Sequence, residues 1–191
     1  QRQMCIRDSH DTPPSMFRQS IPTRSMSLPF SSERIVHFKT AEEYTAQIEV
    51  QKQEDLFVLY ERFIGTYADL EKNWYQFLDK YKDFLNEKTL LVERFFNDPA
   101  ITSPLQCICD ICMTVEPDCG LSNVMRISGG QWIVYHFDGK IKDIFETLEG
   151  IFSVWFPQSG YKMTRRYGLN IYRRFDRDNH SVIMDLYIPI S

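Results

Sequence analysis

The sequence predicts an α+β domain made of two similar units, each with the order strand, strand, helix, strand, strand. Three observations predict this fold class. An apolar, aromatic-rich run closed by glycine occurs twice, an amphipathic helix pattern follows each run, and two alternating runs separated by a turn follow each helix. We therefore expect a tandem repeat with a pseudo-two-fold arrangement, antiparallel sheets and one main helix in each unit.

The composition is that of a folded protein. The chain has 191 residues, of which 43% are hydrophobic and 14% aromatic, and its net charge is -4. No stretch approaches the roughly eighteen uninterrupted apolar residues of a membrane span, so we expect no membrane partner. A mildly acidic total also argues against a free-standing nucleic-acid binder, which usually presents a basic surface.

Residues 1–40 differ from the rest of the chain. They contain four prolines, seven serines and six basic against three acidic residues, with no helix or strand period. Residues 1–9 look like a translated sequencing-adaptor remnant, and the chain opens on Gln1, so we expect a fragment that has lost its true N-terminus. We interpret this segment as the linker or tail of another domain, followed by a compact domain at 41–191.

The first unit covers about residues 44–118. Strands are predicted at 46–51 and 57–65, and alternating runs at 90–96 and 107–115 predict a hairpin. Between them lies an amphipathic helix whose apolar residues recur at spacings of three and four: Trp74, Phe77, Leu78, Tyr81, Phe84 and Leu85.

The second unit, about residues 119–191, repeats this order. Its predicted elements are two strands joined by a Gly129-Gly130 turn, a helix and a hairpin, at residues 123–127, 132–139, 141–156, 169–175 and 182–190. Asp110 and Asp185 fall at the same place in the last strand of their units, which supports the alignment of the two halves.

Five cysteines, an odd number, occur in a chain without a signal-peptide pattern near its start. Together these features predict free thiols in a reducing cytoplasm. Cys109-x-x-Cys112 has the spacing of a zinc or redox pair, but on a strand this spacing places the two side chains on opposite faces. We therefore predict core cysteines, no metal site and no cofactor.

The sequence contains no nucleophile elbow, phosphate loop or His-Glu-x-x-His motif. The four histidines are scattered, and His136 lies in an apolar strand, where a structural role is expected. We therefore predict no catalytic residues and a protein that is not an enzyme.

A spaced set of motifs resembles a known family. The Gly129-Gly130 turn, the run Trp155-Phe156-Pro157-Gln158-Ser159-Gly160-Tyr161 and the end Tyr187-Ile188-Pro189-Ile190 together resemble the GyrI-like (gyrase-inhibitor-like) effector-binding domain, over roughly residues 44–191. Thr12-Pro13-Pro14-Ser15-Met16-Phe17-Arg18 resembles the end of an AraC-type helix-turn-helix module.

The resemblance implies the ligand-sensing domain of a cytoplasmic bacterial transcription regulator. It implies a small lipophilic or aromatic ligand bound between the two repeats. DNA would be contacted only through the missing helix-turn-helix module, and a homodimer is left open. A ligand would act by preferring one state of the regulator over another.

The resemblance also implies site residues. Many family members carry a glutamate in the penultimate strand that meets a cationic ligand, and the matching position here is Asn170. An amide has no charge to pair with a cation, so a neutral ligand is as well supported. The candidate ligand-binding residues are Asn170 and Tyr172 for polar recognition, Trp132, Trp155 and Trp74 as apolar walls, and Asp185 as another source of charge. Which strand face lines the pocket stays open.

Two alternatives remain. Some members of the family hydrolyse small compounds in the same cleft, but the absent glutamate counts against acid–base catalysis. A protein-interaction module, in the sense of the gyrase inhibitors, is the other, and the segment Thr12–Arg18 favours a regulator instead.

Overall fold

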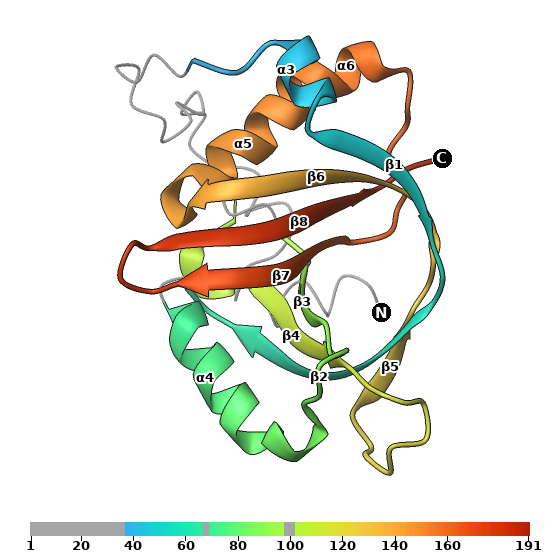
Figure 1. Ribbon diagram of the computed structural model, residues 1–191, viewed down its shortest axis with the longest axis vertical. Helices are drawn as coiled ribbons and strands as arrows, with labels where there is room; N and C mark the ends of the chain where they lie inside the picture. Colours follow the sequence, from blue (N-terminus) through green and yellow to red (C-terminus); the bar gives the residue numbers. More distant parts are fainter. Residues whose placement is uncertain (1–36, 67–68, 98–101) are drawn as a thin grey trace, which may run out of the picture. The chain divides into compact units, whose positions relative to one another are not determined.

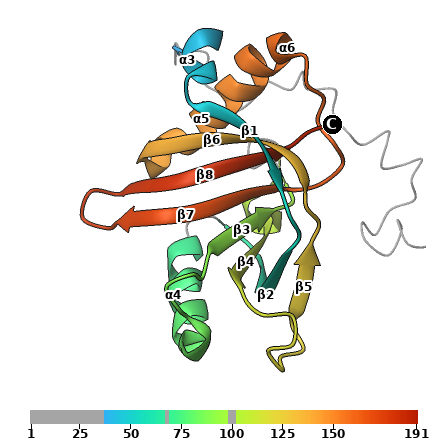
Figure 2. The same cartoon turned by 45° about the vertical axis from the view of Figure 1, so that its right-hand side comes forward.

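Eight strands form one antiparallel sheet in the computed structural model, which describes residues 37–66, 69–97 and 102–191 (Figures 1 and 2). The strand order is β1-β6-β8-β7-β3-β4-β2-β5. The strands are β1 (Ile48–Gln53), β2 (Leu56–Ile64), β3 (Leu91–Phe95), β4 (Ile108–Thr114), β5 (Val124–Ile127), β6 (Gly130–Lys140), β7 (Gly168–Asp176) and β8 (Ser181–Pro189). The α+β class and every predicted strand are confirmed to within a few residues.

Short and long helices connect these strands: α3 (Ala41–Thr45), α4 (Leu70–Lys80), η2 (Lys82–Phe84), η3 (Pro104–Gln106), η4 (Ile141–Asp143), α5 (Ile144–Gly150), the π-helical turn η5 (Ile151–Trp155) and α6 (Phe156–Ser159). Both predicted main helices are present, and the second is composite. The sequence analysis missed α3, which a reciprocal capping box between Thr40 and Glu43 begins. No helix within the described ranges is long and apolar enough to cross a membrane.

The predicted hairpin at Gly129-Gly130 is wrong. β5 pairs with β2, where Leu56 lies opposite Ile127, while β6 pairs with β1, where Gln53 lies opposite Gly130. The chain therefore continues through a bend at residues 128–129 instead of reversing. Gly129 allows the backbone to lie close to β1, because a Cβ there would lie 2.4 Å from the Gln53 carbonyl oxygen. Gly130 has a φ of +136°, which side chains other than glycine rarely allow.

Helices α4 and α5 both pack on one face of the sheet, here called the helix face. Under α5 and η5 lies an apolar cluster that includes Ile133, Tyr135, Met184, Leu186, Ile151 and Trp155. Under α4 lies a second cluster formed by Leu59, Ile111, Met113, Phe77 and Tyr81. Asp69, at the N-cap of α4, makes no side-chain capping hydrogen bond, so burial of this apolar stripe holds the helix in place.

The opposite face, here called the inner face, carries a third cluster. Its side chains come from strands at both ends of the order, including Val58, Ile127, Trp132, Leu169, Ile171 and Tyr187. Because these residues pack together, the sheet must curl until its two ends meet around them. Side chains on both faces of the central strands are therefore buried.

The cysteines follow the predicted alternation. Cys109 lies on the helix face, while Cys112 belongs to the inner-face cluster. Cys107, Cys109 and Cys112 are buried and, with Cys119, are free thiols.

Candidate functional site

Three carboxylates are buried among the described residues: Glu93 (2% exposed), Asp110 (0%) and Asp185 (6%). Charged groups are rarely buried without a partner, because removing them from water costs several kcal/mol. The contacts of each carboxylate therefore indicate whether its role is structural or in binding.

Glu93 is held by neutral donors. It lies on β3 directly opposite Asn170 of β7, with both side chains on the helix face. The Tyr172 hydroxyl donates a hydrogen bond of 2.7 Å to Glu93 Oε2, and Asn170 Nδ2 donates one of 3.4 Å to the same oxygen. Within the described ranges no lysine, arginine or histidine forms a salt bridge with Glu93.

This environment raises the pKa of both Glu93 and Tyr172. Burial raises the pKa of Glu93, although the hydrogen bonds from Tyr172 and Asn170 act in the opposite direction. Burial and the charge of Glu93 hold the pKa of Tyr172 well above its usual value. Asn170 Oδ1 is buried without a hydrogen-bond partner in the structure, which leaves an acceptor beside the carboxyl.

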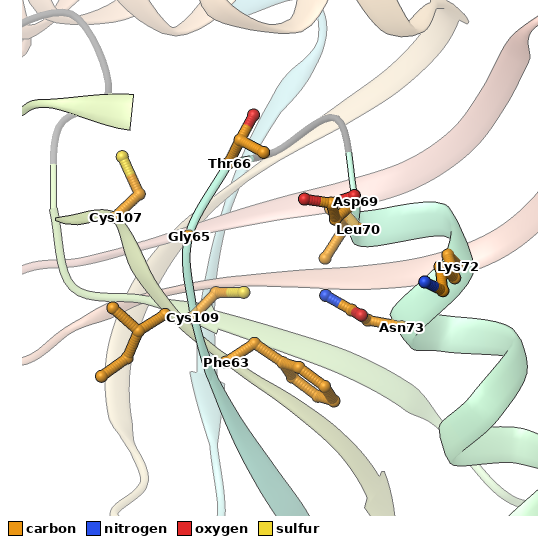
Figure 3. Close-up of a pocket in the computed structure, with 10 residues that line it drawn as sticks. Phe63, Gly65, Thr66, Asp69, Leu70, Lys72, Asn73, Cys107 and Cys109 are labelled. Atoms are coloured by element: carbon orange, nitrogen blue, oxygen red, sulfur yellow. The ribbon is translucent and has the colours of Figure 1, made fainter. Parts of the chain in front are cut away.

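A cavity of about 290 Å³ lies on the same face, between the start of α4 and the strands β2 and β4 (Figure 3). Phe63, Cys107 and Cys109 form the strand side. Figure 3 shows Asn73 on α4 pointing across the cavity toward these strands, with Leu70 above it. The cavity therefore has apolar and polar walls within one depression.

Cys109 connects this cavity to Glu93. Cys109 lines the cavity and lies opposite Phe95, two residues along β3 from Glu93 on the same face. Burial, followed by the nearby charge of Glu93, raises the pKa of Cys109 to about 12, so its thiol stays protonated at neutral pH.

Trp74 lies at the same junction. It follows Asn73 on α4, and its ring contacts the Tyr172 ring edge-on, with the ring centres 5.4 Å apart. The Trp74 indole N–H is buried without a hydrogen-bond partner in the structure.

The other two carboxylates lie on the inner face and have cationic partners. Asp110 on β4 receives Arg62 from β2 and Arg94 from β3, at 2.8 Å and 2.6 Å. Asp185 on β8 receives His136 Nδ1 from β6 at 2.8 Å and Arg173 from β7 at 2.7 Å. These contacts compensate their charge, so both have structural roles.

The structure brings together only some of the predicted site residues. Asn170 and Tyr172 contact Glu93 on the helix face, and Trp74 contacts the Tyr172 ring. Trp132 and Asp185 lie on the inner face, away from this group. Trp155 is buried under the composite helix, where its Nε1 donates to Thr45 Oγ1 at 3.0 Å.

The sequence analysis missed Glu93. In the run Leu91-Val92-Glu93-Arg94-Phe95, two adjacent charged residues suggest a solvated strand. One signal was available: Glu93 alternates in phase with Leu91 and Phe95, which places it on an apolar face. Among the residues that the structure describes, no three His, Cys, Asp or Glu side chains are placed to hold a metal ion.

Comparison with known proteins gives a family match over most of the chain. Residues 46–191 match the family described as GyrI-like small molecule binding domain. The probable transcriptional regulator YgiV of Escherichia coli K12 is 33% identical over 103 residues, which are 50% of this chain and 64% of YgiV. The chain therefore spans less than two thirds of this relative.

Solved structures share the fold at low sequence identity. The C-terminal domain of EcmrR superposes with a TM-score of 0.63 at 12% identity, over 76% of this chain and 97% of that domain. A hydrolase encoded by lin2189 of Listeria innocua superposes with a TM-score of 0.53 at 12% identity, over 76% of this chain and 92% of the hydrolase. At this identity both similarities establish the fold alone.

Proposed function

The chain belongs to the GyrI-like small-molecule binding domains, and we propose that it binds a small lipophilic cation on the helix face, with Glu93 as the counter-ion. One observation carries the proposal: of the three buried carboxylates, Glu93 alone has only neutral hydrogen-bond donors around it. A cation that reaches Glu93 would supply the charge that the protein itself supplies to Asp110 and Asp185.

The walls around Glu93 suit an aromatic cation. Phe63 lines the neighbouring cavity, Tyr172 donates to the carboxyl, and the Trp74 ring contacts the Tyr172 ring. Aromatic faces attract cations. We therefore propose Asn170, Tyr172 and Trp74 as ligand-binding residues together with Glu93. The proposed ligand therefore combines a positive charge with an aromatic ring.

We further propose that this domain senses its ligand for a transcription regulator. The relative YgiV is a probable transcriptional regulator, which supports this role. The resemblance of Thr12–Arg18 to an AraC-type module lies outside the described residues, and so does the adaptor-like start. On the same basis we propose a helix-turn-helix module, domain limits at residues 1–40 and 41–191, a cytoplasmic location and a homodimer.

The pseudo-two-fold duplication also remains a proposal. Strand order supports it, because β2-β4-β3 in the first half corresponds to β6-β8-β7 in the second. The equivalent positions of Asp110 and Asp185, each between two basic side chains on neighbouring strands, support it as well. Glu93 and Asn170, paired directly across β3 and β7, would then lie beside the pseudo-axis.

A hydrolase is the alternative that a structural neighbour's description raises. The cavity offers Cys109, whose protonated thiol is a poor nucleophile. Oε2 of Glu93 already accepts two hydrogen bonds, from Tyr172 and Asn170. We therefore propose binding without turnover.

Titration calorimetry with phenyltrimethylammonium and its uncharged isostere tert-butylbenzene tests the ligand class. We expect the cation to bind at least about tenfold more tightly, because a charge-assisted contact contributes more than a neutral one. In Glu93→Gln this preference should disappear, since the carboxyl charge is lost while the shape is kept.

Glu61→Gln is the matched control. Glu61 lies beside α4 on the helix face, where it accepts hydrogen bonds from Lys80 and Tyr81. This variant should keep the preference for the cation. Equal binding of both probes to the unmodified protein, or equal loss in both variants, would contradict the role of Glu93.

A further inference from the structure

We propose that the inner face holds an anion site at Arg62 and Arg94, which takes a small aromatic carboxylate. The two arginines form one row with Asp110, because Arg62 of β2 and Arg94 of β3 both lie opposite Asp110 of β4. Arg94 follows Glu93 on β3, so the two side chains lie on opposite faces of the sheet. The site therefore does not rest on the function proposed above.

The charges of this row do not cancel. Within residues 37–66, 69–97 and 102–191, Asp110 is the only carboxylate that forms a salt bridge with either arginine. Arginine is always protonated, so one negative charge faces two positive charges. At Asp185 the second basic side chain is His136, which is charged only if it is protonated. A ligand with a single negative charge would therefore complete the compensation at Arg62 and Arg94.

Each guanidinium also has unused hydrogen-bond donors. Arg62 binds Asp110 through Nε and Nη2, at 2.8 Å and 3.1 Å, and Arg94 uses the same two nitrogens, at 3.1 Å and 2.6 Å. Arginine has five N–H donors, so Nη1 of each remains without a hydrogen bond to the part of the chain that the structure describes. The Arg62 side chain is 47% exposed and that of Arg94 16%. Arg62 is therefore the accessible donor, and Arg94 contributes mainly charge.

The two guanidinium groups are held in place before any ligand arrives. Both lie over the Phe96 ring, at 4.6 Å and 4.7 Å from its centre. Both also bind Asp110, whose side chain is fully buried. A fixed donor loses little conformational entropy when it binds, and the planar guanidinium matches the geometry of a carboxylate. These contacts favour recognition of an anion at Arg62.

Tyr167 adds an aromatic surface beside the arginines. Its ring contacts the Phe96 ring, with the ring centres 4.4 Å apart, and the Arg94 guanidinium lies 5.6 Å from its centre. Tyr167 is 48% exposed, so a ligand ring can reach it. Aromatic pairs gain energy beyond the burial of their area. A ligand that joins a carboxylate to an aromatic ring therefore matches both parts of this surface.

Two-dimensional NMR of the 191-residue chain tests the proposal, with benzoate as the probe and benzamide as its uncharged counterpart. We expect saturable shifts of the Arg62 side-chain Nε–H and the Tyr167 backbone N–H with benzoate. Benzoate should bind at least about threefold more tightly than benzamide, because its contact with Arg62 is charge-assisted but partly exposed. The Trp74 indole resonance, which reports on the site proposed at Glu93, should stay in place.

Arg62→Gln removes the accessible guanidinium, while Arg94 still compensates Asp110. In this variant the preference for benzoate should disappear. Arg126→Gln is the matched control, because Arg126 is 59% exposed and also pairs with a carboxylate, that of Asp55 at 3.0 Å. This variant should keep the preference.

Equal affinities of the unmodified protein for benzoate and benzamide would overturn the proposal. So would no binding of either probe, a shift at Trp74 without one at Arg62, or an equal loss of benzoate binding in the two arginine variants. The first three readings use the unmodified protein and do not depend on the folding of a variant.

Discussion

Glu93 and Asp110 lie on neighbouring strands and are almost equally buried, but their surroundings are opposite in kind. Asp110 lies on the inner face between two arginines. Glu93 lies on the helix face and accepts hydrogen bonds from a hydroxyl and an amide. Burial alone therefore does not assign a role to a carboxylate, because the charge around it decides whether the fold or a ligand compensates it.

Asp110→Asn should have the largest effect on stability. It leaves Arg62 and the 16% exposed Arg94 without a negative partner, and we expect the free energy of unfolding to fall by about 3 kcal/mol. Urea denaturation at pH 7 measures it. Asp55→Asn is the matched control: this ion pair with Arg126 is exposed, so the loss should stay below about 1 kcal/mol. Similar losses in both variants would contradict the structural role of Asp110.

Asn170→Asp should have the next largest effect. It places a second carboxyl beside Glu93, and two such groups cannot both ionise at low cost. We expect a loss of about 2 kcal/mol at pH 8 and a smaller loss at pH 5, where the pair can keep a proton. An equal loss at both values would assign the effect to the altered hydrogen bond.

Glu93→Gln should stabilise the ligand-free protein. Because burial raises the folded-state pKa of Glu93, its contribution to stability is complete below the unfolded-state pKa and is lost as pH rises through the folded-state value. Glutamine imitates the protonated form, so we expect a gain of about 1 kcal/mol at pH 7 that disappears in acid. Thermal unfolding from pH 4 to pH 8 measures it, and a pH-independent difference would argue against ionisation as the cause.

Arg62→Lys should have the smallest effect on stability. It tests how much the Arg62 contact with Asp110 contributes. Arg62 contacts both Asp110 oxygens and stacks on Phe96, at 4.6 Å from the ring centre, and lysine cannot reproduce this fork. Its side chain is 47% exposed, so the loss should be about 0.5 kcal/mol. The same change at the less exposed Arg94 should cost more. The reverse order would mean that exposure does not govern these two contacts.

The sequence predicted the elements well because each has a strong local period. The alternation around Cys109 and Cys112 and the helical spacing of Trp74 and Phe77 appear in the structure as expected. The partner of β5 was mispredicted, because a glycine pair fits a reversal as well as a bend with close backbone contact. Only the position of Gln53 on a distant strand decides between them.

The site was partly predictable. Asn170 and Tyr172 were found through a family resemblance, while their partner Glu93 lies in the other half of the chain. The carboxyl that is absent at Asn170 is supplied by Glu93, directly opposite on the neighbouring strand β3. No local sequence pattern reveals this pairing. Asp185 does alternate away from Met184 and Leu186, but curling of the sheet buries this face too, and Arg173 compensates its charge.

The pairing of β1 with β6 and of β2 with β5 also governs how the protein can be made. β1 of the first half pairs only with β6 of the second half, where Ile48 lies opposite Tyr135. β5 of the second half pairs only with β2 of the first half, where Ile127 lies opposite Leu56. A ribosome therefore has to release most of the chain before the sheet can close, and pairings this distant in sequence slow folding. Expressing the two halves separately should give two insoluble fragments. The whole sheet is therefore the smallest part of this domain that can fold.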